Sequence, residues 1–356
     1  MGRLFEASDN VLQGPLGPTS SWKDSLNLCQ WTGVTCSHRH PRVTKLDLRS
    51  KSIGGFLSPF VGNPSFVRVI VLATNSFYGE IPNESDYRTT PTFHWKSFSS
   101  AAILDWRVQI GRLTDSILHS FSIASNLEIL NLSENRFTGK LEYNQLVGTI
   151  PDTTGELRNL QAPDLSENNL NGIIPDSFGN LTLLNHVPLG FSNLQGELRL
   201  PISGIIPLKM TYLDNIYAFG LEYNQLTGTI PYTIVLNSLW LGFNNLQGNI
   251  PSSFGNCKNL MLLNVSNNKL TGTSSPQLLE ITTLSILLGL SDNLFSGSIP
   301  PKVGNLKTII HLDISRNRFS GEIPTTLSAC AGLQYLTMMG NSFSGKIPSS
   351  LISLEA

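Results

Sequence analysis

Apolar residues recur along this chain in a spaced pattern that ends at an asparagine. The pattern reads Leu-x-Leu-x-x-Asn-x-(Leu/Phe)-x-Gly, and in "LQYLTMMGN" its apolar positions are Leu333, Leu336 and Met338. Successive residues of a strand point to opposite faces, so this alternation directs one set of side chains inward and the intervening set outward. Each copy therefore predicts a short β-strand that ends at the asparagine, where the chain must turn.

The copies repeat with a dominant step of 24 residues. Aligned on the asparagine, they lie at Asn75, Asn135, Asn144, Asn168, Asn224, Asn244, Asn268, Asn293, Asn317 and Asn341, with Lys51 and Ser192 in the equivalent place. One such coil cannot bury its apolar side alone, so neighbouring coils must stack. A step of this length is typical of leucine-rich repeats. We expect an α/β solenoid of about twelve rungs, built mostly from short parallel strands.

The asparagines are expected to link neighbouring coils. An amide both donates and accepts hydrogen bonds, so it can satisfy backbone groups of its own coil and of the next one. This predicts a ladder of Asn75, Asn168, Asn224, Asn244, Asn268, Asn293, Asn317 and Asn341. Asn135 and Asn144 cannot both belong to it, because no closed coil fits into the nine residues between them.

A second signature, Gly-x-Ile-Pro, follows the asparagine in most copies. Examples are "GTIP" at 148–151, "GNIP" at 248–251 and "GEIP" at 321–324. Glycine permits a tight bend, isoleucine is expected to be buried, and proline sets the direction of the chain on the convex side.

The combined pattern LxxLxLxxNxLxGxIP resembles the plant-specific leucine-rich repeat. The segment "SSWKDSLNLCQWTGVTCSHRHPRVTKLDL" is similar to the N-terminal cap of that family. The whole chain resembles the ectodomain of a plant leucine-rich-repeat receptor-like kinase, and is most similar to the subgroup of immune receptors for bacterial peptides. The resemblance covers residues 20–356 except about 84–108. It implies a superhelix or horseshoe, with a cap at 1–42 and the solenoid at 43–356.

Two segments depart from the period. Residues 84–108 carry no copy of the motif and are either an irregular insertion, such as a functional island loop, or a diverged rung or translated non-coding sequence. Residues 136–143 read as an insertion left from a second rung whose middle was lost. Together they favour an irregular gene copy that is decayed or misannotated.

Composition narrows the functional classes. Charged residues make up 14 % and the net charge is −1, so charge gives no reason to expect nucleic acid or an anionic membrane as a partner. We expect no contact of this chain with a membrane, since no apolar run approaches the length of a span and the N-terminus lacks a secretory pattern. The resemblance nevertheless implies the extracellular, apoplastic side of the plasma membrane.

Cysteines and glycosylation motifs bear on whether the chain is exported. In an exported protein, Cys29 and Cys36 are expected to form a disulfide that closes the cap, whereas a redox or metal role would require further ligands. We expect no metal site, since His38 and His40 do not supply a ligand set. Glycosylation motifs occur at Asn83, Asn131, Asn180 and Asn264.

Binding is the remaining role, because we find no nucleophile–base pair, phosphate loop or HExxH motif and expect neither catalysis nor a cofactor. The positions two, four and six before each asparagine point outward on the concave sheet. A candidate ligand site combines such positions with two adjacent residues: Trp240, Phe243, His311, Asp313, Arg316, Tyr335 and Thr337. The alternative is ordinary surface variation.

The resemblance implies a domain that recognises a peptide or protein ligand, in defence-related sensing of pathogen patterns, with a leucine-rich-repeat co-receptor kinase as a second partner. Members of that family carry a separate Ser/Thr kinase domain. Two alternatives stay open: a standalone interaction protein similar to polygalacturonase inhibitors, and a non-functional truncated copy.

Overall fold

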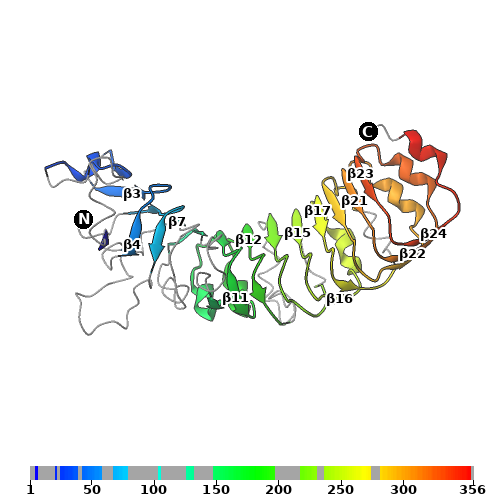
Figure 1. Cartoon of the computed structure of the whole chain (residues 1–356), viewed down its shortest axis with the longest axis horizontal. Helices are drawn as coiled ribbons and strands as arrows, with labels where there is room; N and C mark the ends of the chain where they lie inside the picture. Colours follow the sequence, from blue (N-terminus) through cyan, green and yellow to red (C-terminus); the bar gives the residue numbers. More distant parts are fainter. Residues whose placement is uncertain are drawn as a thin grey trace. The chain divides into compact units, whose positions relative to one another are not determined.

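A computed structural model describes the positions 5–6, 21, 25–38, 42–57, 67–78, 103–105, 126–131, 147–196, 217–230, 236–273 and 281–353. The chain forms two compact units, residues 1–184 and residues 185–356. Each unit is built from short parallel strands that stack side by side (Figure 1). We describe each unit by itself.

The first unit carries a ladder of parallel strands with an antiparallel strand at its start. The ladder strands are β3 (Val43–Asp47), β5 (Val69–Val71), β7 (Ile103–Asp105), β8 (Ile129–Asn131) and β10 (Ala162–Asp164), and β2 (Val34–Cys36) pairs antiparallel with β3. Away from this sheet lie β1 (Phe5–Glu6), β4 (Gly54–Leu57), β6 (Ser76–Tyr78), β9 (Val147–Thr149) and β11 (Asn169–Gly172), with the 3₁₀ helices η1 (Leu28–Gln30), η4 (Asp152–Glu156) and η5 (Asp176–Asn180).

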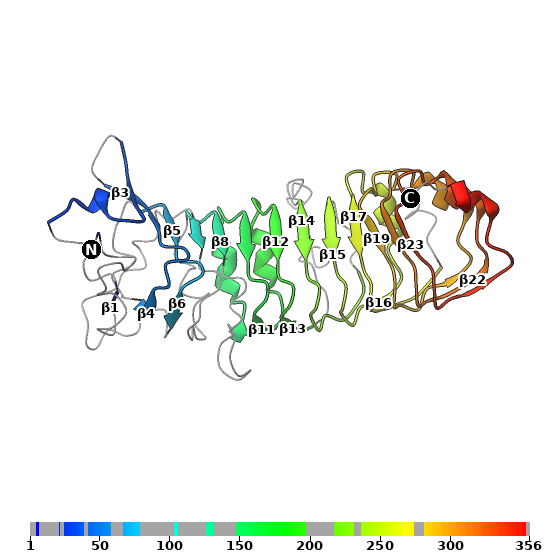
Figure 2. The same cartoon turned by 45° about the horizontal axis from the view of Figure 1, so that its top comes forward.

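The second unit contains a seven-stranded parallel sheet, whose strands run side by side in Figure 2. In order they are β12 (His186–Pro188), β14 (Ala218–Gly220), β15 (Ser238–Trp240), β17 (Leu262–Asn264), β19 (Leu287–Gly289), β21 (His311–Asp313) and β23 (Tyr335–Thr337). Away from this sheet, each coil runs back toward the next strand, and we call this part the return side. It holds β13 (Asn193–Leu194), β16 (Gln247–Gly248), β18 (Lys269–Leu270), β20 (Ser296–Gly297), β22 (Arg318–Glu322) and β24 (Ser342–Ser344), with η7 (Ser252–Asn256), η9 (Pro301–Asn305), η10 (Thr325–Ala329) and η11 (Ser349–Ser353).

The core of the second unit is a row of leucines. The middle residues of β15, β17, β19 and β21 pair in one unbroken register, and all four are buried: Leu239, Leu263, Leu288 and Leu312. Burial of a leucine side chain contributes about 2 kcal/mol, but only where a neighbouring coil covers it. The 24-residue period therefore becomes a continuous apolar interior.

Proline starts the helical turn on the return side. Pro251, Pro300 and Pro324 stand directly before η7, η9 and η10, and each adopts an extended backbone. The first turn then places Phe254, Val303 and Leu327 in the core. All helices in the described part of the chain are 3₁₀ helices, because a coil of this length leaves room for only one tight turn.

The ladder asparagines hold successive coils together. Asn244 Nδ2 donates to the carbonyl oxygens of Leu221 (2.9 Å), Leu241 (3.1 Å) and Gly242 (3.2 Å), and its Oδ1 accepts from the backbone N–H of Leu226 (3.0 Å). Asn224, Asn268, Asn293, Asn317 and Asn341 repeat these contacts, and Asn75 repeats them in the first unit.

The predicted parallel-strand solenoid is confirmed. The count of about twelve rungs is not confirmed and stays a prediction, because complete coils are described around only some of the strands. The segment 136–143 lies outside the described residues, as do Asn135, Asn144 and most of 84–108. Residues 103–105 form β7 between β5 and β8, so this part of the irregular segment occupies a place in the ladder. The boundary at residues 42 and 43 stays a prediction.

Candidate concave binding surface

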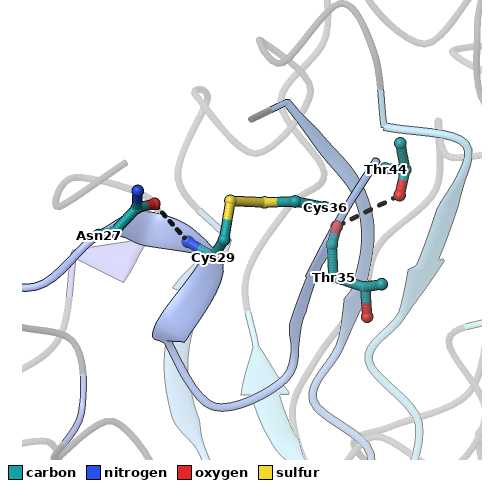
Figure 3. Close-up of a disulfide and its surroundings, with 5 residues drawn as sticks. All are labelled: Asn27, Cys29, Thr35, Cys36 and Thr44. Atoms are coloured by element: carbon teal, nitrogen blue, oxygen red, sulfur yellow. Dashed lines mark hydrogen bonds between the residues drawn. A yellow bond between two sulfur atoms is a disulfide. The ribbon is translucent and has the colours of Figure 1, made fainter. Parts of the chain in front are cut away.

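A disulfide joins the two cysteines near the start of the chain (Figure 3). Cys29, in η1, is bonded to Cys36, at the end of β2, with 5.6 Å between their Cα atoms. Asn27 Oδ1 accepts from the backbone N–H of Cys29 (3.0 Å) and so caps the helical turn, while Trp31 between the two cysteines is buried. The bridge ties η1 to the strand that covers the edge of β3.

Each coil turns through a left-handed residue immediately before the ladder position. In the second unit these residues are Phe191, Tyr223, Phe243, Asn267, Asp292, Arg316 and Gly340, with φ between 48° and 69°. Left-handed backbone is rare for residues with a side chain, so its recurrence reflects a demand of the coil itself. It also places one residue of each of these coils at the same edge of the sheet, and all of these residues except Gly340 carry a side chain.

Three of these side chains form an aromatic column. Phe191 and Tyr223 stack with ring centroids 4.3 Å apart and an interplanar angle of 16°, and Tyr223 and Phe243 stack at 4.0 Å and 10°. Tyr223 and Phe243 each remain 42 % exposed. Of the three, the sequence identified only Phe243 as a candidate, because irregular spacing around Asn224 hides the alignment of the three coils.

The later candidates gather on β21 and β23. The rings of His311 and Tyr335 stack with centroids 4.3 Å apart, and Tyr335 is 58 % exposed. Asp313 pairs in register with Thr337 on the next strand. Arg316 Nη1 lies 3.5 Å from Asp292 Oδ1, at the edge of the same surface. The structure therefore brings five of the seven candidates into what we call the β21–β23 cluster.

Trp240 lies apart from that cluster, at the end of β15. Its register partners are Gly220 on β14 and Asn264 on β17. With Phe243 it marks the earlier part of the surface, and β17 and β19 separate it from the β21–β23 cluster. The candidates thus form two groups on one sheet rather than one continuous stripe.

Glu222 is a residue that the sequence reading missed. It stands two places before Asn224, at an outward position, and its carboxylate lies against Gly190 and Gly220. Its Oε2 atom is buried and has no hydrogen-bond partner. Burial raises the pKa of the Glu222 carboxyl above its ordinary value, and a hydrogen bond from its own backbone N–H lowers it in part. The alternation of inward and outward positions along the strand was the sequence signal that could have identified Glu222 as a residue of this face.

The described glycosylation motifs differ in environment. Asn180 is exposed at the end of η5, on the return side of its coil. Asn264 is half-buried on β17, where its Oδ1 accepts from the backbone N–H of Ser266 (3.0 Å). Asn131 is half-buried on β8, and Asn83 lies outside the described residues.

The remaining thiols are buried in the second unit. Cys257 and Cys330 are not in a disulfide, and Cys330 Sγ donates to the carbonyl oxygen of Val303 (3.3 Å). Burial raises the pKa of Cys257, and it raises that of Cys330 to about 11. Such thiols stay protonated at neutral pH and are poor nucleophiles.

Of the two histidines near the N-terminus, His38 is exposed and His40 lies outside the described ranges. Within them, no group of three or more His, Cys, Asp or Glu side chains is arranged for a metal ion. No helix there is sufficiently long and apolar to cross a bilayer.

Two family models match the chain. The leucine-rich-repeat N-terminal domain matches residues 5–37. The leucine-rich repeat matches residues 126–142, 164–181, 235–257, 308–330 and 332–354. Over these ranges the chain is similar to leucine-rich-repeat proteins, in agreement with its parallel-strand solenoid.

The curated relatives are plant receptors of Arabidopsis thaliana. Receptor-like kinase TMK4 is 31 % identical over 80 % of this chain and 28 % of its own length. Receptor-like protein 6 is 28 % identical over 83 % of this chain and 23 % of its own length. The receptor-like kinase EFR is 45 % identical over 18 % of this chain and 6 % of its own length. The chain thus spans less than a third of each relative.

Solved structures of plant receptor ectodomains share this fold. The ectodomain of the Arabidopsis thaliana receptor kinase GASSHO1/SCHENGEN3, in complex with CASPARIAN STRIP INTEGRITY FACTOR 2, superposes with a TM-score of 0.76 and 28 % identity, over 95 % of this chain and 41 % of that one. The plant peptide hormone receptor RGFR1, in complex with RGF2, gives 0.58 and 29 %, over 92 % and 55 %. This chain therefore resembles plant leucine-rich-repeat receptor ectodomains that bind peptide ligands.

Proposed function

We propose that this chain is the ligand-recognition part of a plant receptor-like kinase, and that it senses a pathogen-derived peptide at the extracellular side of the plasma membrane. Its outward residues on the seven-stranded sheet would hold an extended peptide, and a leucine-rich-repeat co-receptor kinase would join the complex. The defence role rests on the resemblance of "GVTCS" and "RVTKLDL" near the N-terminus to the immune-receptor subgroup.

The observation that carries the proposal is the β21–β23 cluster. Its side chains project from strands whose backbone is fixed by pairing on both sides of β21, so they lose little conformational freedom when a ligand binds. An exposed tyrosine, a histidine, an aspartate and an arginine offer both stacking and charge, the combination that anchors peptides at interfaces. The peptide complexes of the two similar ectodomains support a ligand of this kind.

A chimeric receptor tests the proposal. Residues 1–356 are fused to the membrane-spanning and kinase segments of EFR and expressed in plant cells, which are then treated with a panel of synthetic microbial peptides. We expect an oxidative burst to at least one peptide, and Tyr335→Ala should raise the half-maximal peptide concentration about tenfold. Arg318→Ala, an exposed change on the return strand β22, is the matched control and should change it less than twofold.

Two results would count against this function. One is a chimera that reaches the cell surface but responds to no peptide of the panel. The other is an equal effect of the Tyr335 and Arg318 changes, which would show that the ligand does not bind at the β21–β23 cluster.

A further inference from the structure

The outward face of the second unit carries an uneven charge. At the positions one, two, four and six before each ladder residue from β12 to β23, the acidic residues are Glu222, Asp292 and Asp313, and the basic residue is Arg316. One base minus three acids gives −2 with histidines neutral, although the chain as a whole carries only −1. Arg316 is already within 3.5 Å of Asp292. This face therefore favours a cationic partner.

Glu222 is the acid whose surroundings compensate it least. Asp313 Oδ1 accepts from the backbone N–H of Ser315 (3.0 Å) and from Ser315 Oγ (2.7 Å). By contrast, Glu222 Oε2 is buried with no hydrogen-bond partner. The outward positions of the two neighbouring coils carry no lysine or arginine. They hold His186, Pro188, Gly190 and Phe191 on the β12 coil, and Ser238, Trp240, Gly242 and Phe243 on the β15 coil. A buried carboxylate oxygen without a partner costs free energy, which a cation could recover.

Glycines create the space that the Glu222 carboxylate occupies. A Cβ atom at Gly190 would lie 2.9 Å from Glu222 Cδ and 3.0 Å from its Oε1, and a Cβ atom at Gly220 would lie 3.1 Å from its Oε2. Any other residue at these two positions would push the carboxylate away from the sheet. Gly242, the outward residue on the next coil at the same level, also has no side chain. The carboxylate is thus recessed among bare backbone, beside the aromatic column.

We propose that Glu222, seated on Gly190 and Gly220, is the subsite for one arginine or lysine side chain of the peptide ligand. The proposal rests on the function proposed above and adds the charge that the ligand must carry. The side chain enters over the missing Cβ atoms, the carboxyl group turns about its last bond to present Oε2, and the cation supplies the missing donor. Trp240, on the strand after Glu222, flanks the path of the peptide.

The subsite can be tested with a small probe that needs no knowledge of the ligand. The full chain is labelled with 5-fluorotryptophan, and the ¹⁹F resonance of Trp240 is assigned with Trp240→Phe. The probe is acetyl-Gly-Arg-Gly-amide, and its comparison is the same tripeptide with citrulline, which replaces the guanidinium by a neutral urea. We expect the arginine probe to shift the Trp240 resonance with at least tenfold higher affinity than the citrulline probe.

Three variants distinguish binding of the arginine probe at Glu222 from general attraction of a cation to the negatively charged face. Glu222→Gln should abolish the preference for arginine over citrulline. Gly190→Ala keeps the charge but displaces the carboxylate, so it should weaken arginine binding severalfold. Glu322→Gln removes an exposed acid from the return strand β22 and should leave binding within twofold.

Binding of the arginine probe should also strengthen as pH rises through the pKa of Glu222, because the cation prefers the ionised carboxylate. Equal binding of both probes, or a preference that survives Glu222→Gln, would overturn the proposal. Equal binding of guanidinium or putrescine at the same concentration would make the subsite a site for free cations, and would also overturn it. If the arginine probe binds as expected but the chimeric receptor stays silent, the subsite stands and the receptor function fails.

Discussion

At the scale of single residues, an asparagine amide forms hydrogen bonds with buried backbone groups that apolar packing cannot satisfy. The turn at the end of each strand leaves buried carbonyl and N–H groups without a partner in their own strand. One buried side chain such as Asn244 satisfies four of these groups, on its own coil and on the preceding one. The preceding residue takes the left-handed backbone that brings the amide into place.

The first prediction concerns Asn244→Ala, which leaves three carbonyl groups and one N–H group of the buried turn without this partner. Some of these groups keep other hydrogen bonds, so we expect the free energy of unfolding to fall by about 3 kcal/mol in urea denaturation. Asn245→Ala, at the exposed neighbouring position, is the control and should change it by less than about 0.5 kcal/mol. A loss below 1 kcal/mol for Asn244→Ala would show that water replaces the amide.

At the scale of elements, alternation predicts which residues of a strand face outward, because a strand has only two faces. In β15 and β21 the middle leucine is buried and the residues on either side of it are half-buried. Alternation did not reveal that Phe191, Tyr223 and Phe243 stack. That contact depends on which coils are neighbours and on the left-handed residue of each, and the steps of 32 and 20 residues around Asn224 conceal both. Glu222 was missed for a related reason, since the space it occupies depends on Gly190 of the preceding coil as well as on Gly220 of its own coil.

The strand β3 provides a prediction on pH dependence. Burial alone would raise the pKa of Asp47, but hydrogen bonds from Arg49 Nε (2.9 Å) and Nη2 (2.9 Å) and the nearby Lys45 Nζ (3.0 Å) outweigh it and lower that pKa from 3.8 to about 2. A depressed carboxyl pKa stabilises the fold above the unfolded value, and this contribution is lost as pH falls from about 4 to about 2.

Asp47→Asn tests this contribution. Because the two cations are largely exposed, solvent screening reduces the effect, and we expect the variant to be about 1 kcal/mol less stable than the parent at pH 7. The difference should shrink steadily as pH falls from about 4 to about 2, where the Asp47 carboxyl of the folded parent is about half protonated. Urea denaturation of the two chains at pH 7, 4 and 2 measures it, and a difference that is constant with pH would contradict the assignment.

At the scale of the whole molecule, the two sides of a coil differ in what they can accept. In the first unit Asn180 is exposed at the end of η5, whereas in the second unit Asn264 lies on the sheet, against Gly242 and Gly289. A glycan on Asn264 would stand in the middle of the proposed ligand surface and would also require the side chain to leave its hydrogen bond with Ser266.

We therefore expect the chain, secreted from plant cells, to carry glycan on Asn180 and none on Asn131 or Asn264. Enzymatic deglycosylation in H₂¹⁸O followed by peptide mass spectrometry reports occupancy at each asparagine. Asn180→Gln should remove the signal without lowering stability by more than about 0.5 kcal/mol. High occupancy at Asn264 would be incompatible with both the proposed ligand surface and the Glu222 subsite.

The aromatic column has a consequence for how such a gene can change. Arrays of similar repeats lengthen and shorten by recombination between copies, and the apolar interior tolerates this because consecutive coils are nearly interchangeable. The three rings are not interchangeable in this way, since each requires an aromatic neighbour exactly one coil away. Gain of a coil between residues 191 and 243 would preserve the solenoid and yet separate the rings, and loss of the Tyr223 coil would reduce the column to one pair. Inheritance of this column therefore demands a fixed order of coils where the rest of the fold does not.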